Sequence, residues 1–328
     1  MHYDLIVIGS GPAGRRAAIQ AAKLGKRALV VDRGRRLGGV SVHTGTIPSK
    51  TLRETVLNLS GWRERGFYGR AYRVKKDIPA QDLVKRLHIT LNHEVEVLEH
   101  QFARNRVESM QGAARFVDPH RIEVTAEGGE CLVLSADRFV LAVGTRPFRP
   151  DYVPFDGERI LDSDEILDMA ALPRNLAVIG AGVIGVEYAT IFSALDVPVT
   201  LVEPRDTMLD FLDRELVQEF THDLRDRGMA LRMGCKVQGI ERANGGCVVR
   251  LENGRTVNAE MVLFAAGRVG STDRLNLEAC GIELDHRGRV AVDKATFQTS
   301  VPHIYAAGDV IGFPSLASTS MEQGRIAA

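Results

Sequence analysis

The sequence has 328 residues, 45% of them hydrophobic, which is enough for two α/β domains that each bury a core. Lysine plus arginine and aspartate plus glutamate number 42 each, so the formal net charge is zero. This balance gives no electrostatic reason to expect nucleic acid or an anionic membrane as a partner, and small molecules or another protein chain are expected instead.

The sequence carries no sign of export or membrane insertion. Its N-terminus runs into the apolar stretch at residues 5–8 without the basic start and long apolar segment of a signal peptide. Residues 176–192 contain three glycines and Glu187, which favours a strand, a tight turn and a helix over a membrane span. The four cysteines lack C-x-x-C spacing, so we expect free thiols, no metal and a cytoplasmic protein.

One internal repeat dominates the organisation of the chain. The segment L-I-V-I-G-S-G-P-A-G at residues 5–14 recurs 171 positions later as L-A-V-I-G-A-G-V-I-G at residues 176–185. After each copy an alanine-rich helical stretch leads to a second apolar run that ends in an acid, Asp32 or Glu203. Each acid lies 18 residues beyond the third glycine of its copy (14 to 32 and 185 to 203). Two matched strand–helix–strand units of the Rossmann type are therefore predicted.

The two G-x-G-x-x-G runs predict two dinucleotide sites. The first glycine permits a tight turn, the second lets backbone approach a pyrophosphate, and the third lets the helix pack on the strand. The phosphate then lies at the helix N-terminus, and the acid accepts hydrogen bonds from the adenosine ribose. The expected binding residues are Gly9, Gly11, Pro12, Ala13, Gly14 and Asp32 in the first copy, and Gly180, Gly182, Val183, Ile184, Gly185 and Glu203 in the second.

The remaining elements complete two similar domains. Helical spacing predicts one long amphipathic helix from near Asp82, and short β-like runs at residues 112–134 and 235–257 predict two antiparallel insertions. A later apolar run closes on a glycine in each copy, Gly144 and Gly267. The expected fold class is α/β, with two Rossmann-like dinucleotide-binding domains that each carry a small antiparallel β insertion. The apolar positions of the long helix are Leu83, Leu87, Leu91, Val95, Leu98 and Phe102.

Two further segments are specific, G-G-V-S-V-H-T-G-T-I-P-S-K at residues 38–50 and I-Y-A-A-G-D-V at residues 304–310. With the repeat, they make nearly the whole chain resemble the pyridine nucleotide disulfide oxidoreductases, which include dihydrolipoamide dehydrogenase and glutathione reductase. The resemblance implies FAD in the first dinucleotide site and NAD(P) in the second. It implies an FAD-binding domain at residues 1–147 and 269–328, with the NAD(P)-binding domain at residues 148–268.

The resemblance also implies roles for single residues. Asp309 is expected at the flavin ribitol, and main chain near Ala114 at the adenine. Lys50 is expected near flavin N5 and paired with Glu187, because a cation there favours the reduced flavin and a carboxylate keeps the lysine charged. The alternative for Lys50 is a lysine on a helix surface. The other residues expected to bind are Gly38, Gly39, Ser41, Thr46 and Gly144 for FAD, and Gly267 for NAD(P).

One departure from the family pattern bears on the function. Disulfide reductases carry two cysteines five positions apart in the loop at residues 38–50. Ser41 and Thr46 stand there in this chain, and neither side chain forms a disulfide, which excludes a thiol relay at the flavin. This loop and the segments at residues 312–318 and 322–325 are similar to family members that transfer hydride between NADPH and NAD⁺. Two alternatives are an NAD(P)H oxidase or diaphorase, and a redox-inactive FAD-binding module.

The choice of nicotinamide nucleotide and the assembly are further expectations. Glu203 favours NAD(H), because a carboxylate repels the 2′-phosphate of NADP(H). Arg205 could bind that phosphate, or it is an ordinary exposed arginine. Val183 stands where glutathione reductase relatives carry an aromatic gate, and simple packing explains a valine equally well. The family continues into a C-terminal interface domain that this sequence lacks, so we expect a fragment, and a homodimer for the full-length form.

Overall fold

The computed structural model describes residues 1–243 and 245–328, and their contacts divide them into two compact units. The first unit comprises Met1–Ile47, Leu91–Arg146 and Arg268–Ala328, and the second comprises Pro48–Thr90 and Pro147–Gly267. The division lies within one residue of the predicted boundaries near 147 and 268. Residues 48–90 differ, since the sequence grouped them with the first unit. They belong to the second by contact because, among other interactions, Lys50 pairs with Glu187 and Arg65 with Asp196.

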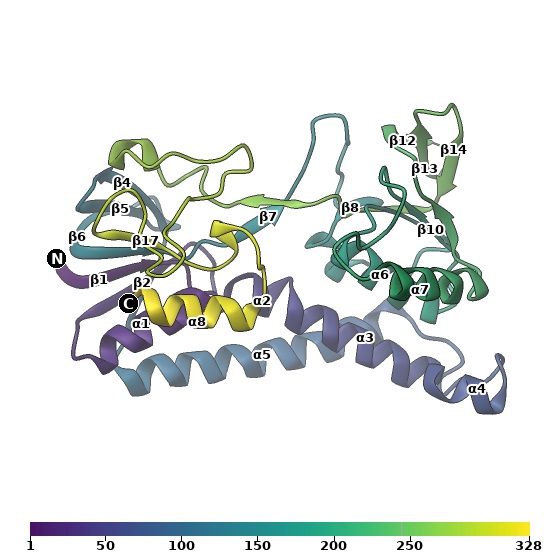
Figure 1. Cartoon of the computed structure of the whole chain (residues 1–328). Coiled ribbons are helices and arrows are strands. Elements are labelled where there is room, and N and C mark those ends of the chain that lie inside the picture. Colours follow the sequence, from purple (N-terminus) through teal and green to yellow (C-terminus); the bar gives the residue numbers. More distant parts are fainter. Residues whose placement is uncertain (244) are drawn as a thin grey trace. The chain divides into compact units, whose positions relative to one another are not determined.

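The first unit is built on a seven-stranded sheet in the order β3-β2-β1-β6-β5-β4, with β17 paired to β6 (Figure 1). Strands β1, β2, β3 and β17 and the second half of β6 run parallel, whereas β4, β5 and the first half of β6 pair antiparallel. The predicted insertion is therefore continuous with the parallel sheet through β6. The strands are β1 His2–Ile8, β2 Ala28–Asp32, β3 Glu108–Gln111, β4 Ala113–Asp118, β5 Arg121–Thr125, β6 Cys131–Leu141 and β17 Ile304–Ala306.

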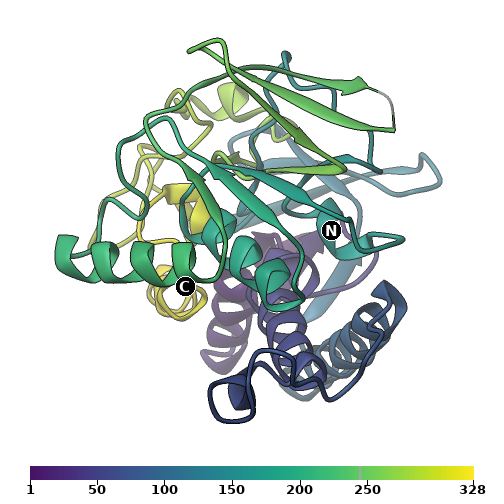
Figure 2. The same ribbon diagram turned by 90° about the vertical axis from the view of Figure 1, so that its right-hand side faces the viewer.

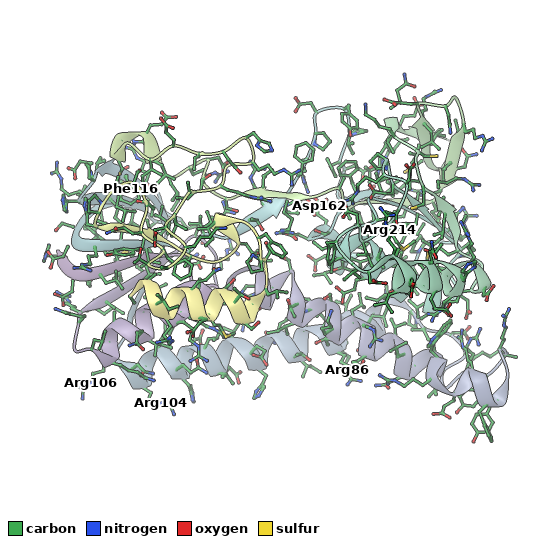
Figure 3. The ribbon with its side chains drawn as sticks, viewed as in Figure 1. Arg86, Arg104, Arg106, Phe116, Asp162 and Arg214 are labelled. Carbon is green, nitrogen blue, oxygen red and sulfur yellow. The ribbon has the colours of Figure 1, made fainter. Side chains whose placement is uncertain are left out.

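Both faces of this sheet are covered, as the alternation along β1 shows. Ile6 and Ile8 belong to one buried cluster and Leu5 and Val7 to another, which is the burial expected of the centre of a parallel sheet. Phe116, labelled in Figure 3, lies in the first cluster and meets the ring of Phe139 edge-on at 5.1 Å between centroids. The second cluster includes the alanine face of helix α1, Pro12–Lys23.

Helix α8, Ala317–Ala327, packs closely along α1, and the two lie side by side in Figures 1 and 2. A Cβ built on Gly324 of α8 would lie 2.1 Å from the carbonyl oxygen of Ala13, so the close approach requires glycine there. The predicted long helix is confirmed as α5, Ala80–Asn105. Five of its six apolar positions are buried and Leu91 is half-buried, as their spacing predicted.

The second unit repeats this design. Its five-stranded sheet has the order β11-β10-β9-β15-β8, with every pair parallel, and β9 takes the place of β1 between β10 and β15. A separate antiparallel sheet, β12-β13-β14, is the predicted insertion. The predicted α/β fold with two Rossmann-like units is confirmed. The strands are β8 Ile160–Asp162, β9 Leu176–Ile179, β10 Val199–Val202, β11 Ala230–Arg232, β12 Val237–Ala243, β13 Gly246–Leu251, β14 Thr256–Ala259 and β15 Met261–Phe264.

The other elements are short or flank these sheets. Strands β7 and β16 pair as a two-stranded sheet. Among the described residues, no helix combines the length and the apolar character that crossing a membrane requires. The elements are β7 Thr145–Pro147, β16 Arg268–Gly270, α2 Gly39–His43, α3 Thr46–Ser60, α4 Arg65–Tyr68, α6 Val183–Ala194, α7 Arg214–Asp226, and the 3₁₀ helices η1 Trp62–Glu64, η2 Glu165–Asp168, η3 Leu277–Cys280 and η4 Asp309–Ile311.

Candidate functional site

In the first glycine run, residues 9–14, neighbouring backbone leaves no room for a side chain at the first and third glycines. Only the second glycine has free space around it. Gly9 has φ +104°, and a Cβ built on it would lie 2.3 Å from the carbonyl oxygen of Ala142. A Cβ on Gly14 would lie 1.9 Å from the carbonyl oxygen of Gly9, so α1 packs this closely on β1 only with glycine there. Around Gly11, by contrast, no atom of the described residues outside its chain neighbours lies within 4 Å of a built Cβ. Backbone at Gly11 is therefore open to a phosphate.

The second glycine run, residues 180–185, has the same geometry. Gly180 also has φ +104°, and its built Cβ would lie 2.6 Å from the carbonyl oxygen of Ala265. A Cβ on Gly185 would lie 1.9 Å from the carbonyl oxygen of Gly180, whereas the space around Gly182 is open. The repeat seen in the sequence is thus a repeat of close approaches, with an open position at the same place in each run.

Both runs end at a helix that leaves its first amides without a side-chain cap. Gly11 is the N-cap of α1 and Gly182 the N-cap of α6, and neither helix carries an acidic residue in its first turn. Helix N-termini of this kind attract anions, because unpaired N–H groups and the helix dipole both favour negative charge. The residues present therefore fit a dinucleotide pyrophosphate in each unit.

The predicted ribose-binding acids are tied to the glycine runs through the residue between the first two glycines. Asp32, at the end of β2, accepts hydrogen bonds from the amide of Ser10 at 2.7 Å and from that of Gly34 at 2.8 Å. Glu203, just after β10, accepts one from the amide of Ala181 at 2.6 Å. Each acid is thus held beside the turn that precedes its helix.

Ser10 is a site residue that the sequence analysis missed. It is fully buried, and its hydroxyl donates to Asp32 while accepting a hydrogen bond from the amide of Gly38 at 2.9 Å. Ser10 therefore connects the first glycine run, the acid and the loop at residues 38–50. The available signal was a hydroxyl side chain in an otherwise apolar turn, where Ala181 stands in the second copy.

Arg205 does not stand free beside Glu203. Its Nε and Nη2 donate to the two carboxylate oxygens of Glu203 at 2.8 and 3.3 Å, and its Nη1 lies 2.7 Å from Oδ2 of Asp210. Burial alone would raise the pKa of Glu203, but the guanidinium of Arg205 and the amides of Ala181 and Arg205 lower it below its usual range. The same hydrogen bond from Arg205 to Glu203 raises the pKa of the guanidinium. The sequence analysis did not single out Asp210.

The loop at residues 38–50 begins against the first glycine run. A Cβ built on Gly39 would lie 3.0 Å from the Cα of Gly11, so this glycine lets the two backbones meet. Ser41 is half-buried in α2, and Thr46 begins α3. His43 lies between them and bonds through Nε2 to the carbonyl oxygen of Leu37 at 2.9 Å. None of the four cysteines lies in this loop, and all four are free.

Lys50 and Glu187 meet within the second unit, as the sequence analysis expected. The ammonium of Lys50, on α3, donates to Oε1 of Glu187, on α6. The lysine side chain is 60% exposed and that of the glutamate 17% exposed, so the carboxylate is fixed and the lysine remains accessible. Within the second unit, the ion pair joins α3 to α6, the helix of the second glycine run. The pairing with Glu187 is the geometry that the family resemblance implies, and the exposed side chain of Lys50 also lies on the surface of α3.

Asp309 lies at the start of η4, beside α8. Burial raises the pKa of its carboxyl group, and the guanidinium of Arg268 and the hydroxyl of Ser320 oppose that shift. The preceding amide, of Gly308, donates to the side-chain oxygen of Gln323 at 2.8 Å, which attaches this turn to α8. A half-buried carboxylate at this position can accept hydrogen bonds from a ligand that brings hydroxyl groups.

The other predicted positions lie at the ends of strands. The amide of Gly112 donates to the carbonyl oxygen of Asp32 at 2.9 Å, which places the main chain before Ala114 beside the end of β2. Gly144 follows β6 with φ +64°, and Gly267 follows β15 with φ +124°. In the part of the chain that the structure describes, a Cβ built on either would meet nothing within 4 Å. These positions leave space at the ends of the parallel strands, where α/β sheets bind ligands.

A cavity of about 290 Å³ lies elsewhere in the second unit and contains none of the predicted site residues. Its lining mixes arginines with apolar side chains from α3, η1, α6 and α7. The features that suit a phosphate, an open glycine position and a helix N-terminus without a side-chain cap, lie at the glycine runs and not at this cavity. The lining residues are Arg53, Val56, Leu57, Trp62, Arg63, Thr190, Ile191, Ala194, Phe220 and Arg227.

Curated relatives cover almost the whole of this chain. It is 52% identical over 327 residues to the soluble pyridine nucleotide transhydrogenase of Mycobacterium bovis (strain BCG / Pasteur 1173P2), which covers 99% of this chain and 70% of the relative. It is 41% identical over 326 residues to the protein of the same name from Escherichia coli O1:K1 / APEC, with the same two shares. The chain thus spans about 70% of the length of these relatives.

Solved structures show the same fold. The crystal structure of LpdA from Mycobacterium tuberculosis superposes with a TM-score of 0.89 at 31% identity, and covers 98% of this chain and 71% of that one. The Cu(II) complex of the HOCl-induced flavoprotein disulfide reductase RclA from Escherichia coli superposes with a TM-score of 0.87 at 25% identity. The match covers 100% of this chain and 70% of that one. The family model described as "Pyridine nucleotide-disulphide oxidoreductase" matches residues 3–324. This protein is therefore an oxidoreductase that belongs to the pyridine nucleotide-disulphide oxidoreductase family.

Proposed function

We propose that this protein transfers hydride from NADPH to NAD⁺ through FAD, without a redox-active disulfide. The reaction is NADPH plus NAD⁺ giving NADP⁺ plus NADH, so that one hydride moves and the atoms balance. One observation carries the proposal: the chain keeps the Lys50–Glu187 ion pair, while Ser41 and Thr46 stand where disulfide reductases of this family carry cysteines. The names of the relatives at 52% and 41% identity support the same reaction.

FAD would bind in the first unit. The pyrophosphate would lie at Gly11 and the N-terminus of α1, the adenosine ribose at Asp32, and the adenine along the main chain at Ala114. The half-buried carboxylate of Asp309 would accept hydrogen bonds from the ribitol hydroxyls. The loop from Gly38 to Thr46 would line the flavin end of the site.

The nicotinamide nucleotides would bind in the second unit, at Gly182 and the N-terminus of α6, with the adenosine ribose at Glu203. Because the chain offers one glycine run for them, NADPH and NAD⁺ would take turns at one site. The first product would then leave before the second substrate binds, which is a ping-pong scheme. Val183, 59% exposed at the first position of α6, leaves the entry to this site unobstructed by a large side chain.

When bound, FAD supplies a centre that accepts a hydride from one nicotinamide and returns it to another. The role of the chain is electrostatic. Lys50 would place a positive charge beside the electron-rich flavin, and Glu187 holds the lysine ammonium in position through the ion pair. Ser41 and Thr46 cannot form a disulfide, so these two positions offer no thiol acceptor for electrons from bound FAD.

The test is an anaerobic titration of the FAD-loaded protein. NADPH is added first and the flavin spectrum is recorded, and thio-NAD⁺ is then added and its reduction followed. Full bleaching without a thiolate charge-transfer band, followed by formation of thio-NADH, is the expected result. Bleaching without transfer would instead favour an oxidase or quinone reductase, and no bleaching would favour a binding module without redox activity.

Assembly is a separate proposal. We infer a homodimer for the full-length form, from the resemblance to a family whose interface domain pairs two chains. Analytical ultracentrifugation of the FAD-loaded full-length protein checks it, and a monomer at micromolar concentration would contradict it.

A further inference from the structure

A second carboxylate besides Glu203, that of Asp210, pairs with Arg205. The guanidinium uses Nε and Nη2 on Glu203 and lies with Nη1 2.7 Å from Asp210. With one cation between two carboxylates, the three side chains carry a formal charge of about −1 at neutral pH. The arginine that could bind a 2′-phosphate therefore already has both of its sides engaged.

Asp210 lies in a loop that is hydrogen-bonded to the second glycine run, and this loop positions it beside Arg205. Met208 is buried, and the amide of Leu209 donates to the carbonyl oxygen of Ala181 at 3.1 Å. Leu209 has φ +47°, a left-handed conformation that a leucine adopts only when its surroundings impose it. The loop turns at this residue, so that the next residue, Asp210, faces the guanidinium.

We propose that Asp210 sets the preference of the second site for NAD(H) over NADP(H), by occupying the Arg205 nitrogen that a 2′-phosphate would need. This inference rests on the proposed NAD(P) site. A 2′-phosphate carries close to two negative charges and would meet a group of side chains whose net charge is already negative. A 2′-hydroxyl is neutral and therefore avoids this charge repulsion.

Asp210 can be replaced without disturbing Glu203. Glu203 is buried and holds the glycine run through Ala181, so its replacement would disturb the turn. Asp210 and Arg205 have side chains that are each 47% exposed, and an ion pair this exposed contributes little to folding. Asp210→Asn therefore removes one charge and frees one side of Arg205 while leaving the fold in place.

The same loop provides a matched control. Asp206→Asn makes the same change of charge four positions earlier, but Oδ1 of Asp206 lies toward Gly234, where a built Cβ would be 3.0 Å from it. A general effect of net charge would appear in both variants, whereas release of Arg205 would appear only in Asp210→Asn.

The experiment is isothermal titration calorimetry at low ionic strength on the FAD-loaded protein, so that the first site is filled. The two probes are adenosine 2′,5′-bisphosphate, which carries the 2′-phosphate, and adenosine 5′-monophosphate, which lacks it. Asp210→Asn should bind the bisphosphate about tenfold more tightly than the wild type does, and the monophosphate within about twofold. Asp206→Asn should bind both probes within about twofold of the wild type.

Two results would overturn the inference. One is an unchanged affinity of Asp210→Asn for the bisphosphate, and the other is an equal gain in Asp206→Asn. If the wild type and both variants bind neither probe, the NAD(P) site itself is wrong and the role of Asp210 falls with it. Because the probes carry no nicotinamide, a protein that binds them but fails to reduce thio-NAD⁺ refutes the proposed hydride transfer and not the role of Asp210.

Discussion

The amide of Ala181 donates to the carboxylate of Glu203 at 2.6 Å, across 22 positions of sequence. Ser10 and Asp32 make the equivalent hydrogen bond in the first unit at 2.7 Å, also across 22 positions. The turn between the first two glycines and the acid at the end of the next strand are therefore one structural device, used twice. It fixes both the helix N-terminus and the carboxylate before any ligand arrives, which lowers the entropic cost of binding.

The two outer glycines of a run and its middle glycine should respond differently to alanine. Gly182 has φ −77°, and a Cβ built on it would lie in open space. The Gly182→Ala variant should therefore melt within about 2 °C of the wild type. Its methyl group would obstruct the approach of a pyrophosphate, and NAD(H) binding should weaken by about tenfold or more. Calorimetry for folding and titration of NADH into FAD-loaded protein measure the two effects.

Gly185→Ala provides the contrast. Its Cβ would lie 1.9 Å from the carbonyl oxygen of Gly180, so α6 must move away from β9 and the melting temperature should fall by about 5 °C or more. Equal melting temperatures for the two variants, or full NADH affinity in Gly182→Ala, would contradict the geometry of the run.

Lys50→Ala should slow reduction of the flavin by NADPH by about tenfold to a hundredfold while leaving FAD bound. The reason is that the ammonium beside Glu187 is the positive charge that we propose for the flavin end of the site, whereas the proposed pyrophosphate and ribose contacts of FAD involve other residues. Stopped-flow absorbance under anaerobic conditions gives the rate, and the flavin content of the purified protein gives the retention.

Arg53→Ala is the control for that variant. Arg53 lies three residues further along α3 and pairs with Glu54, so its removal takes away a cation from the same helix without touching Glu187. Its flavin should be reduced at the wild-type rate within about twofold, and equal slowing in both variants would refute a specific role for Lys50.

The elements that sequence patterns predicted well are those whose signal is local. Helical spacing marked α5, and the repeat of glycines, apolar runs and acids marked both Rossmann-like units, because each depends on residues within about thirty positions of one another. The pairing of Lys50 with Glu187, 137 positions apart, came from the family resemblance and not from any pattern in the residues.

Other features depend on the conformation of single residues, and no pattern encodes that conformation. The contact between Arg205 and Asp210 follows from the left-handed backbone at Leu209, a conformation that leucine does not predict. The buried hydroxyl of Ser10 gains its role from two chain segments that meet it only in the fold. Strand β6 similarly pairs antiparallel along its first half and parallel along its second, and the sequence showed two separate runs.

Alkylation of thiols should leave hydride transfer unchanged. Cys131 is exposed and should react with N-ethylmaleimide, whereas burial raises the pKa of Cys280 to about 11, and that of the buried Cys247 also rises. Mass spectrometry after mild treatment should show Cys131 modified and these two thiols free. Transfer from NADPH to thio-NAD⁺ should then proceed at the untreated rate, and its loss would show that a cysteine takes part.

Asp309→Asn should stabilise the protein without FAD but weaken FAD binding. Burial raises the pKa of the folded carboxyl group, so folding favours its protonated form, and the ionised side chain costs stability above that pKa. The melting temperature of the FAD-free variant should therefore exceed that of the wild type at pH 7. The difference should shrink as pH falls through the raised pKa and vanish below about pH 4, where the acid is protonated in both states.

Asp293→Asn should change the melting temperature in the opposite direction. The carboxylate of Asp293 accepts hydrogen bonds from the amide and the hydroxyl of Thr296 and from the amide of Ala295, which hold the pKa of Asp293 below its usual range. That stability is present above about pH 4 and is lost as pH falls through the lowered pKa, so this variant should melt below the wild type at pH 7. Calorimetry from pH 3 to pH 8 on both FAD-free variants separates the two cases. If Asp309→Asn melts below the wild type at pH 7, the ionised carboxylate of Asp309 stabilises the FAD-free protein. The prediction that ionisation of Asp309 lowers the stability of the FAD-free protein would then be wrong.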